Sequence, residues 1–181
     1  LRPAVLYDEL AAAEITRCVL ERDDKVRILD ADALNIIAGE HIDYKGSREG
    51  QIIITPHIME MSRLTGKTVA DIKEHMIESA KEYAIQHSCI CILKDARTVV
   101  TDGQKVYINC TGNDGMSTGG CGDVLTGLIA GMTAMGLDAF EAACLSVYVH
   151  GKAGDYAASG KGRAGMTAAD ISEAIAYVLK R

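Results

Sequence analysis

The chain has 181 residues, of which 48% are hydrophobic and 24% charged, and this composition excludes a disordered or a collagen-like protein. Acidic residues outnumber basic ones by 25 to 19, and the resulting net charge of −6 makes the chain a poor candidate for a nucleic-acid binder. No apolar run reaches the roughly 20 residues that cross a bilayer, and no signal peptide opens the chain, so we expect a cytoplasmic protein without a membrane partner.

The hydrophobic pattern alternates between helices and short apolar strands. In chain order it predicts a helix over residues 8–22, strands over 26–30 and 51–55, helices after 56 and over 69–87, strands over 89–94, 98–101 and 105–109, and helices over 123–135, 138–158 and 168–180. The length suits one full-sized core, and this order of elements is typical of an α/β fold with a mostly parallel sheet. We therefore expect a single α/β domain over residues 1–181.

Short sequence signals predict where several of these elements begin. Thr55 is expected to cap a helix in which Pro56 takes the first position. Asp102-Gly103 is a hairpin signal between the last two strands. Two helices are expected to begin at capping boxes, formed by Thr68 with Asp71 and by Thr167 with Asp170.

The six cysteines form no CxxC pair and no cluster with zinc-ligand spacing. Most of them have apolar neighbours, where a free thiol behaves as a small hydrophobe. We expect reduced, structural thiols rather than disulfides at Cys18, Cys89, Cys91, Cys110, Cys121 and Cys144.

Residues 111–127 form a glycine-rich segment that leads into an apolar helix. Five glycines stand within residues 112–122 and allow the backbone to approach a ligand closely. Unpaired N–H groups at the start of the helix are expected to form an anion hole, from Gly120, Cys121 and Gly122. The helix dipole stabilises Asp123 as an anion, which beside a bound phosphate can take a proton from an attacking hydroxyl.

A simpler interpretation of this segment is a glycine-rich turn followed by an acidic helix start. Its spacing matches neither the phosphate-binding loop GxxxxGK[ST] nor the dinucleotide-binding motif GxGxxG. Spacing alone therefore leaves both interpretations open.

Five motifs in order resemble those of the ADP/ATP-dependent NAD(P)H-hydrate dehydratases, a family of the ribokinase-like superfamily. The most specific is GNDGMSTGGCGDVLTG at residues 112–127. The others are DADALN at 30–35, TPHIME at 55–60, LKDART at 93–98 and HGKAGD at 150–155. The resemblance runs from about residue 10 to the end, and it implies a ribokinase-like fold with helices flanking the sheet and a short antiparallel hairpin.

The family repairs NADH or NADPH whose nicotinamide ring has added water. The resemblance implies that the ring hydroxyl is phosphorylated by ADP or ATP, that phosphate is then eliminated, and that the chain forms a homo-oligomer, commonly a tetramer. The sequence offers no dedicated protein cage for a metal ion, so we expect Mg²⁺ to arrive with the nucleotide phosphates. Asp123 would be the base and would contact the hydrated dinucleotide together with His57. Gly122 would contact the nucleotide, as would Lys94, Asp95, Ala96, Arg97 and Thr98.

Structural roles compete with several of these assignments. His57 has the alternative of a hydrogen-bonded surface residue, and Lys94 that of a solvated strand end. Asp30 and Asp32 are as suited to capping the next helix as to binding a ligand. For His150 and Asp155, five residues apart on a predicted helix, a structural role is favoured.

The chain departs from the family pattern at three places. Asp95 stands where the family has glycine, which places a negative charge beside the nucleotide site. Cys121 replaces a serine or threonine, which matters little because the backbone N–H binds the anion. Family members also carry βα units ahead of DADALN with a glycine-proline-glycine loop, whose place is taken here by residues 3–7 without glycine, so we expect these amino-terminal units to be missing.

Two other functions remain open at this point. One is a kinase of the same superfamily that phosphorylates a thiazole or hydroxymethylpyrimidine alcohol. The other is a non-catalytic nucleotide-binding fragment or partner subunit, which Asp95 and the missing amino-terminal units favour.

Overall fold

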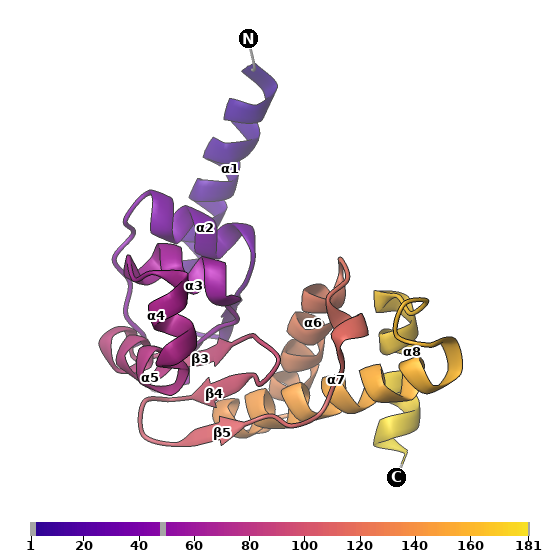
Figure 1. Cartoon of the computed structure of the whole chain (residues 1–181). Coiled ribbons are helices and arrows are strands. Elements are labelled where there is room, and N and C mark those ends of the chain that lie inside the picture. Colours follow the sequence, from indigo (N-terminus) through magenta and orange to yellow (C-terminus); the bar gives the residue numbers. More distant parts are fainter. Residues whose placement is uncertain (1–2, 48–49, 181) are drawn as a thin grey trace.

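Five short strands form one mixed sheet, in which each strand pairs with the next one along the chain (Figure 1). The computed structural model describes residues 3–47 and 50–180, with side chains from residue 10 onwards. The strands are β1 (Arg27–Leu29), β2 (Ile52–Ile54), β3 (Ile90–Leu93), β4 (Val99–Thr101) and β5 (Val106–Ile108). β1, β2 and β3 are parallel, whereas β4 and β5 form an antiparallel hairpin with β3. The mixed α/β fold and the hairpin at Asp102-Gly103 are therefore confirmed.

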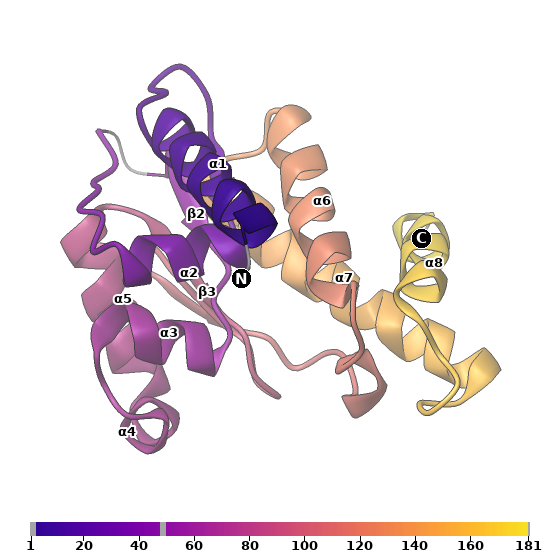
Figure 2. The ribbon, with the colours of Figure 1, turned by 90° about the horizontal axis from the view of Figure 1, so that it is seen from above.

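Helices cover both faces of this sheet because successive side chains of a strand point to opposite faces. The helices are α1 (Pro3–Leu20), α2 (Asp32–Gly39), α3 (Ile58–Thr65), α4 (Val69–Glu74), α5 (Met76–His87), α6 (Cys121–Ala134), α7 (Ala139–Lys161) and α8 (Ala168–Leu179), with a 3₁₀ turn at Asp114–Met116. Ile52 and Ile54 pack against α2, α3 and α5, while Ile53 packs against α6 and α7. Figure 2 shows the two groups of helices on opposite sides. Among the described residues, no helix is long and apolar enough to cross a membrane.

The helix predicted to start at Thr55-Pro56 begins later, and its cap was predicted wrongly. The N-cap is His57, whose Nδ1 accepts from the N–H of Glu60 (3.1 Å), while the Glu60 carboxylate accepts from the N–H of His57 (2.8 Å). Residues 55–57 instead continue alongside β3, because the Pro56 carbonyl accepts from the N–H of Lys94 at 2.8 Å. Sheet pairing thus delays the start of the helix.

The single helix predicted over 69–87 is interrupted at His75, which was not predicted. His75 has φ −125° and ψ 47°, outside the helical region, and separates α4 from α5. Its backbone N–H and its ring Nδ1 both contact the Asp71 carbonyl, at 3.0 and 3.2 Å. The apolar periodicity continues across the break and so does not reveal it. The predicted N-cap before it is confirmed, since the Thr68 hydroxyl accepts from the N–H of Asp71, but among the described residues the Asp71 carboxylate does not return the bond that a capping box requires.

The last helix begins as predicted. The Asp170 carboxylate accepts from both the backbone N–H and the hydroxyl of Thr167, at 2.8 and 2.9 Å. All six cysteines are free thiols, and the buried ones are Cys89, Cys91 and Cys121. Residues 3–7, which were expected at the place of the family's glycine-proline-glycine loop, belong to the first turns of α1.

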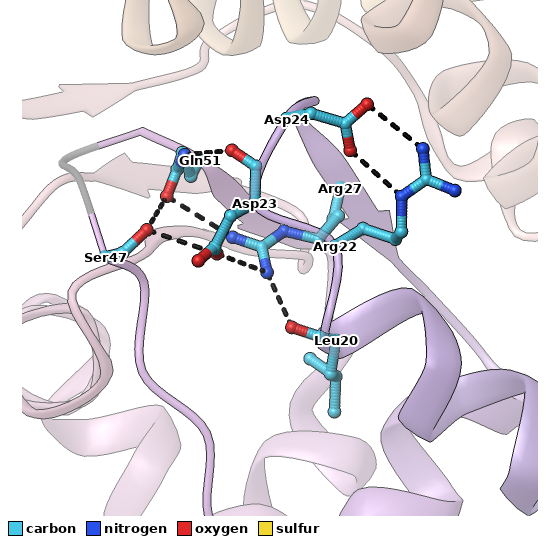
Figure 3. A network of polar contacts seen from close by, with 7 residues as sticks. All are labelled: Leu20, Arg22, Asp23, Asp24, Arg27, Ser47 and Gln51. Carbon is cyan, nitrogen blue, oxygen red and sulfur yellow. Dashed lines mark hydrogen bonds and ion pairs between the residues drawn. The ribbon is translucent and has the colours of Figure 1, made fainter.

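A buried arginine ties α1 to the amino ends of the parallel strands (Figure 3). Arg27 of β1 donates to the Leu20 carbonyl at 2.7 Å, and its guanidinium lies 3.7 Å from the Asp23 carboxylate. It also reaches the side-chain oxygen of Gln51, whose amide donates to the Asp23 carbonyl at 2.8 Å. This network stabilises the end of the sheet opposite to the residues discussed next.

Candidate functional site

The carboxyl ends of β1 and β3 meet the first turn of α6. Asp30 follows β1 and Lys94 follows β3, and the Lys94 ammonium lies 2.9 Å from the Asp30 carboxylate. Thr126 of α6 donates its hydroxyl to the same carboxylate at 3.0 Å. The position of a Cβ at Gly122 is 3.4 Å from the Asp30 carboxylate and 3.7 Å from the Lys94 ammonium. The first turn of α6 therefore faces an ion pair at the carboxyl ends of parallel strands, where ligands of open α/β sheets bind.

The ion pair is partly enclosed, with side-chain exposures of 13% for Asp30 and 23% for Lys94. Burial acts to raise the pKa of Asp30, but the charge and hydrogen bond of Lys94, together with the hydrogen bond from Thr126, outweigh it. The pKa of Asp30 consequently lies below its ordinary value. At neutral pH the site thus holds a carboxylate beside an ammonium.

The backbone at the start of α6 presents unpaired donors. Gly120 is the N-cap with φ 87°, a left-handed conformation that favours glycine. The N–H of Cys121 has only a long contact of 3.4 Å to the Thr118 carbonyl. Within the described residues, the N–H groups of Gly120 and Gly122 have no acceptor. Of the three residues predicted as an anion hole, Gly120 and Gly122 therefore have available donors and Cys121 a weakly engaged one, at the positive end of a 14-residue helix.

Asp123 stands in the first turn of α6 and is exposed. It makes no ion pair or hydrogen bond with any other described side chain, so its carboxylate is available to a ligand. Asp123 is adjacent in sequence to Gly122, whose backbone faces Asp30 and Lys94. A carboxylate within the first turn of a helix whose backbone can bind an anion is suited to proton removal during phosphoryl transfer.

His57 lies at the same end of the sheet. Its backbone is paired with that of Lys94 in a parallel bridge, and its side chain is 48% exposed. The ring Nδ1 is occupied as the cap of α3, while Nε2 lies 3.4 Å from the Glu60 carboxylate. His57 is therefore a hydrogen-bonded cap of α3 whose backbone pairs with Lys94, and its contact with the dinucleotide stays a prediction.

The predicted nucleotide-binding residues beyond Lys94 form the exposed turn between β3 and β4. The Thr98 hydroxyl donates to the Asp95 carbonyl at 3.3 Å and closes this turn. The side chains of Asp95, Ala96 and Arg97 are exposed and make no hydrogen bond or ion pair with the described part of α6. The structure therefore brings Lys94 close to the first turn of α6, whereas residues 95–98 make no contact with that turn through hydrogen bonds or ion pairs among the described residues.

Helix α7 makes hydrogen bonds to the beginning of the glycine-rich segment, at residues 111–113. Asp155 accepts from the N–H of Gly112 and from the side-chain amide of Asn113, both at 3.1 Å. A Cβ at Gly151 would come within 2.1 Å of the Thr111 hydroxyl oxygen, so only glycine allows the segment to lie this close. The structural role favoured for Asp155 fits these contacts.

His150 lies on the same helix, beneath the start of α6. It is only 9% exposed, and its Nε2 has no hydrogen-bond partner among the described residues. Burial lowers its pKa to about 4, the backbone of Cys121 opposes this shift, and the charge of Lys94 adds to it. His150 is thus a neutral, buried neighbour of the anion-binding turn.

That Asp30 binds Lys94 and Thr126 was not predicted from the sequence. The N-cap of α2 is Ala31, with φ 48° and no side-chain cap, and Asp32 is the first helical residue. Asp30 accepts from the N–H of Ala31 but directs its carboxylate to Lys94 and Thr126. The signals that point to this site are the position of Asp30 at the carboxyl end of a parallel strand and the spacing of four residues from Gly122 to Thr126.

Comparison with known proteins gives consistent matches. A family model described as NAD(P)H-hydrate dehydratase matches residues 6–177. The chain is 45% identical over 172 residues to the bifunctional NAD(P)H-hydrate repair enzyme Nnr of Moorella thermoacetica, a match that covers 94% of the chain and 32% of the relative. It is 34% identical over 175 residues to the ADP-dependent (S)-NAD(P)H-hydrate dehydratase of Neisseria meningitidis, with 94% and 59% covered.

Solved structures show the same similarity. The ADP/ATP-dependent NAD(P)H-hydrate dehydratase from Bacillus subtilis, co-crystallized with ATP/Mg²⁺, superposes with a TM-score of 0.80 at 34% identity over 90% of this chain and 57% of that one. A ribokinase-like superfamily protein from Enterococcus faecalis gives a TM-score of 0.80 at 26% identity over 93% of this chain and 58% of that one. The hydroxyethylthiazole kinase from Pyrococcus horikoshii, at 14% identity and a TM-score of 0.67, shows the fold alone. The chain spans between about a third and three fifths of these dehydratase relatives and solved structures.

Proposed function

Because the chain belongs to the NAD(P)H-hydrate dehydratase family and has its ribokinase-like fold, we propose that it takes part in the repair of hydrated NADH and NADPH. The reaction is the dehydration of the hydrated nicotinamide ring, driven by ADP or ATP. The observation that carries this proposal is the first turn of α6, where the backbone of Gly122 faces the Asp30–Lys94 ion pair and where the next residue, Asp123, is an exposed acid. These are the parts that phosphoryl transfer to a hydroxyl requires.

The proposed first step is phosphorylation of the ring hydroxyl. Asp123 accepts the hydroxyl proton as the oxygen forms a bond to the terminal phosphorus of the nucleotide, and the bond from that phosphorus to the bridging oxygen breaks. The N–H groups of Gly120, Cys121 and Gly122 donate to the phosphoryl oxygens in transit, and Lys94 balances their charge.

The proposed second step is elimination of the new phosphate group. The carbon–oxygen bond breaks, phosphate leaves with the electron pair, and loss of a proton from the neighbouring ring position forms the double bond of NADH or NADPH. The same N–H donors stabilise the departing phosphate, so one anion-binding turn serves both steps.

The residues present fit Mg²⁺ that arrives with the nucleotide. Mg²⁺ prefers carboxylate and phosphate oxygens and keeps several waters, so it needs few protein ligands. Asp30 supplies an ionised carboxylate next to the first turn of α6, and Asp123 supplies a second, exposed one. When bound, the ion would neutralise part of the phosphate charge.

The remaining assignments follow from the neighbourhood of the ion pair. His57, beside Lys94, is proposed to contact the hydrated dinucleotide through its exposed ring. The turn of Asp95, Ala96, Arg97 and Thr98 is proposed to line the nucleotide site, since it continues directly from Lys94. We further propose that the protein acts in the cytoplasm as a homo-oligomer.

The test is to incubate the protein with hydrated NADH and either ADP or ATP, with Mg²⁺, and to follow the return of NADH absorbance. We expect recovery that requires nucleotide. Phosphorylation of a thiazole or hydroxymethylpyrimidine alcohol without recovery would indicate the kinase instead, and nucleotide binding without any turnover would indicate a non-catalytic subunit.

A further inference from the structure

Helix α7 supports both ends of the glycine-rich segment, but with different chemistry. At the first end it offers a carboxylate, Asp155, and a backbone carbonyl, that of Tyr148, which accepts from the Thr111 hydroxyl at 3.1 Å. At the second end, where α6 begins, Ala153 packs with Cys121 in an apolar cluster. A polar side chain of α7 also lies near this second end, namely His150, whose ring interacts with the backbone of Cys121.

The ring of His150 is placed where an unsatisfied polar atom is costly. Its Nε2 is buried and lacks a partner of normal hydrogen-bond length among the described residues, although the ring faces the backbone of Cys121. A buried donor or acceptor without a partner destabilises the folded state. An arrangement that gives Nε2 a partner at Cys121 would remove this cost.

The ring is also neutral, which suits its position beside Lys94. Burial and the charge of Lys94 lower the pKa of His150 to about 4, so at neutral pH it carries one N–H donor and no charge. The groups that face it from other elements are Lys94 after β3 and the backbone of Cys121 in α6, while Ser146 lies one turn earlier on α7 with a buried, unpartnered hydroxyl.

We propose that His150 is a positioning residue for the anion-binding turn, and that its Nε2–H donates to the Cys121 carbonyl when an anion occupies that turn. The donor would hold the first turn of α6 in the orientation that points its N–H groups toward the phosphate. This inference rests on the proposed function for the identity of the ligand, a nucleoside diphosphate or triphosphate, but not for the position of the ring.

The experiment compares three variants of the full chain. His150→Phe keeps a ring of similar size without a donor, His150→Gln keeps an uncharged N–H donor, and Ser146→Ala removes a buried, unpartnered hydroxyl from the same helix as a matched control. Two quantities are measured: amide hydrogen exchange at Val124, whose N–H bonds to the Gly120 carbonyl at 3.1 Å, and the dissociation constant of ADP by calorimetry.

We expect His150→Phe to raise the Val124 exchange rate and to weaken ADP binding, each by about tenfold, which corresponds to about 1.4 kcal/mol. His150→Gln and Ser146→Ala should stay within about threefold of the parent. Parent-like exchange and affinity in a folded His150→Phe would overturn the proposal. If the parent itself binds no ADP, the proposed nucleotide site is wrong, and the same comparison of Val124 exchange with inorganic phosphate as the anion decides on His150 alone.

Should His150→Phe not fold, nitrogen-15 NMR of the parent ring decides. The proposal requires a proton on Nε2 whose chemical shift moves when ADP is added. A proton on Nδ1 instead, or an Nε2 proton that ADP leaves unchanged, would refute it.

Discussion

Asp123 is the general base of the proposed reaction, so its replacement should affect turnover more than that of any other single residue. Replacing it by asparagine keeps the size of the side chain but removes the base, so we expect turnover to fall by about 10²- to 10⁴-fold. ADP affinity, measured by calorimetry, should stay within several-fold because the backbone N–H groups of the turn remain. A variant that keeps more than half of the parent's activity would show that another group takes the proton.

Asp95 is expected to weaken nucleotide binding. Two like charges about 4 Å apart repel by about 1 kcal/mol in water, and the exposure of Asp95 places it near this solvated limit. Asp95→Gly should therefore tighten ADP binding about fivefold at low salt, with the gain shrinking as salt screens the charge. Glu74→Gln, which removes an exposed charge from α4, is the matched control. Equal affinities of the glycine variant and the parent at low salt would mean that this turn does not line the nucleotide site.

His150 should make the protein less stable in mild acid. Its pKa is about 4 in the folded protein against an ordinary 6.5, so the unfolded chain binds a proton that the folded protein does not. Stability is therefore lost as the pH falls from about 6.5 to about 4, and we expect about 2 kcal/mol less between pH 7 and pH 5. Urea unfolding of the parent and of His150→Gln separates this effect from the titration of other groups, such as Asp30. Identical pH slopes in the two proteins would contradict the assignment.

At the residue scale, the glycine-rich motif and its neighbours were predictable because glycine, an acid and a helix start have local requirements. Lys94 and Gly122 were expected at one nucleotide site only through the family resemblance, and the structure brings the two close together. The link between Asp30 and Thr126 was not predictable, since it joins residues 96 positions apart and depends on how α6 docks on the sheet.

At the scale of the elements, the start of α3 allows structure and function of His57 to be separated. Asparagine is a good N-cap, whereas alanine is a poor one. We expect His57→Ala to lower the free energy of unfolding by about 1 kcal/mol and His57→Asn to leave it nearly unchanged. Both variants should raise the KM for the hydrated dinucleotide, because neither retains the exposed ring. If His57→Asn keeps the parent's KM, then His57 caps α3 but does not contact the hydrated dinucleotide.

Element types were predictable from periodicity, but two boundaries were not. α3 begins at Ile58 because the backbone of residues 55–57 pairs with Lys94, a tertiary contact that overrides the local preference of Thr55-Pro56. The break at His75 lies inside a continuous apolar pattern, so no period changes there.

At the scale of the whole molecule, unpaired sheet edges favour self-association. β1 and β5 are the outer strands of the described sheet, and β5 exposes 39% of Val106 and 45% of Ile108. An open apolar edge invites pairing with another chain. We expect light scattering at micromolar concentration to give a homo-oligomer, and replacement of Val106 and Ile108 by lysine to shift it toward the monomer. A clean monomer of the parent would contradict this prediction.

The succession of the strands has a further consequence, for the order in which the molecule assembles. Every strand pairs with its immediate successor, so the loops closed by the sheet are comparatively short, and such contacts form early. The contact of Asp30 with Lys94 forms with the sheet, but its contact with Thr126 spans 96 residues and arises only when α6 arrives on a sheet that already exists. We expect the reactive centre to be the last part to form and the first to open. A ligand that contacts both α6 and the sheet would then slow the separation of α6 from the sheet, whereas contacts within the sheet would affect that separation less.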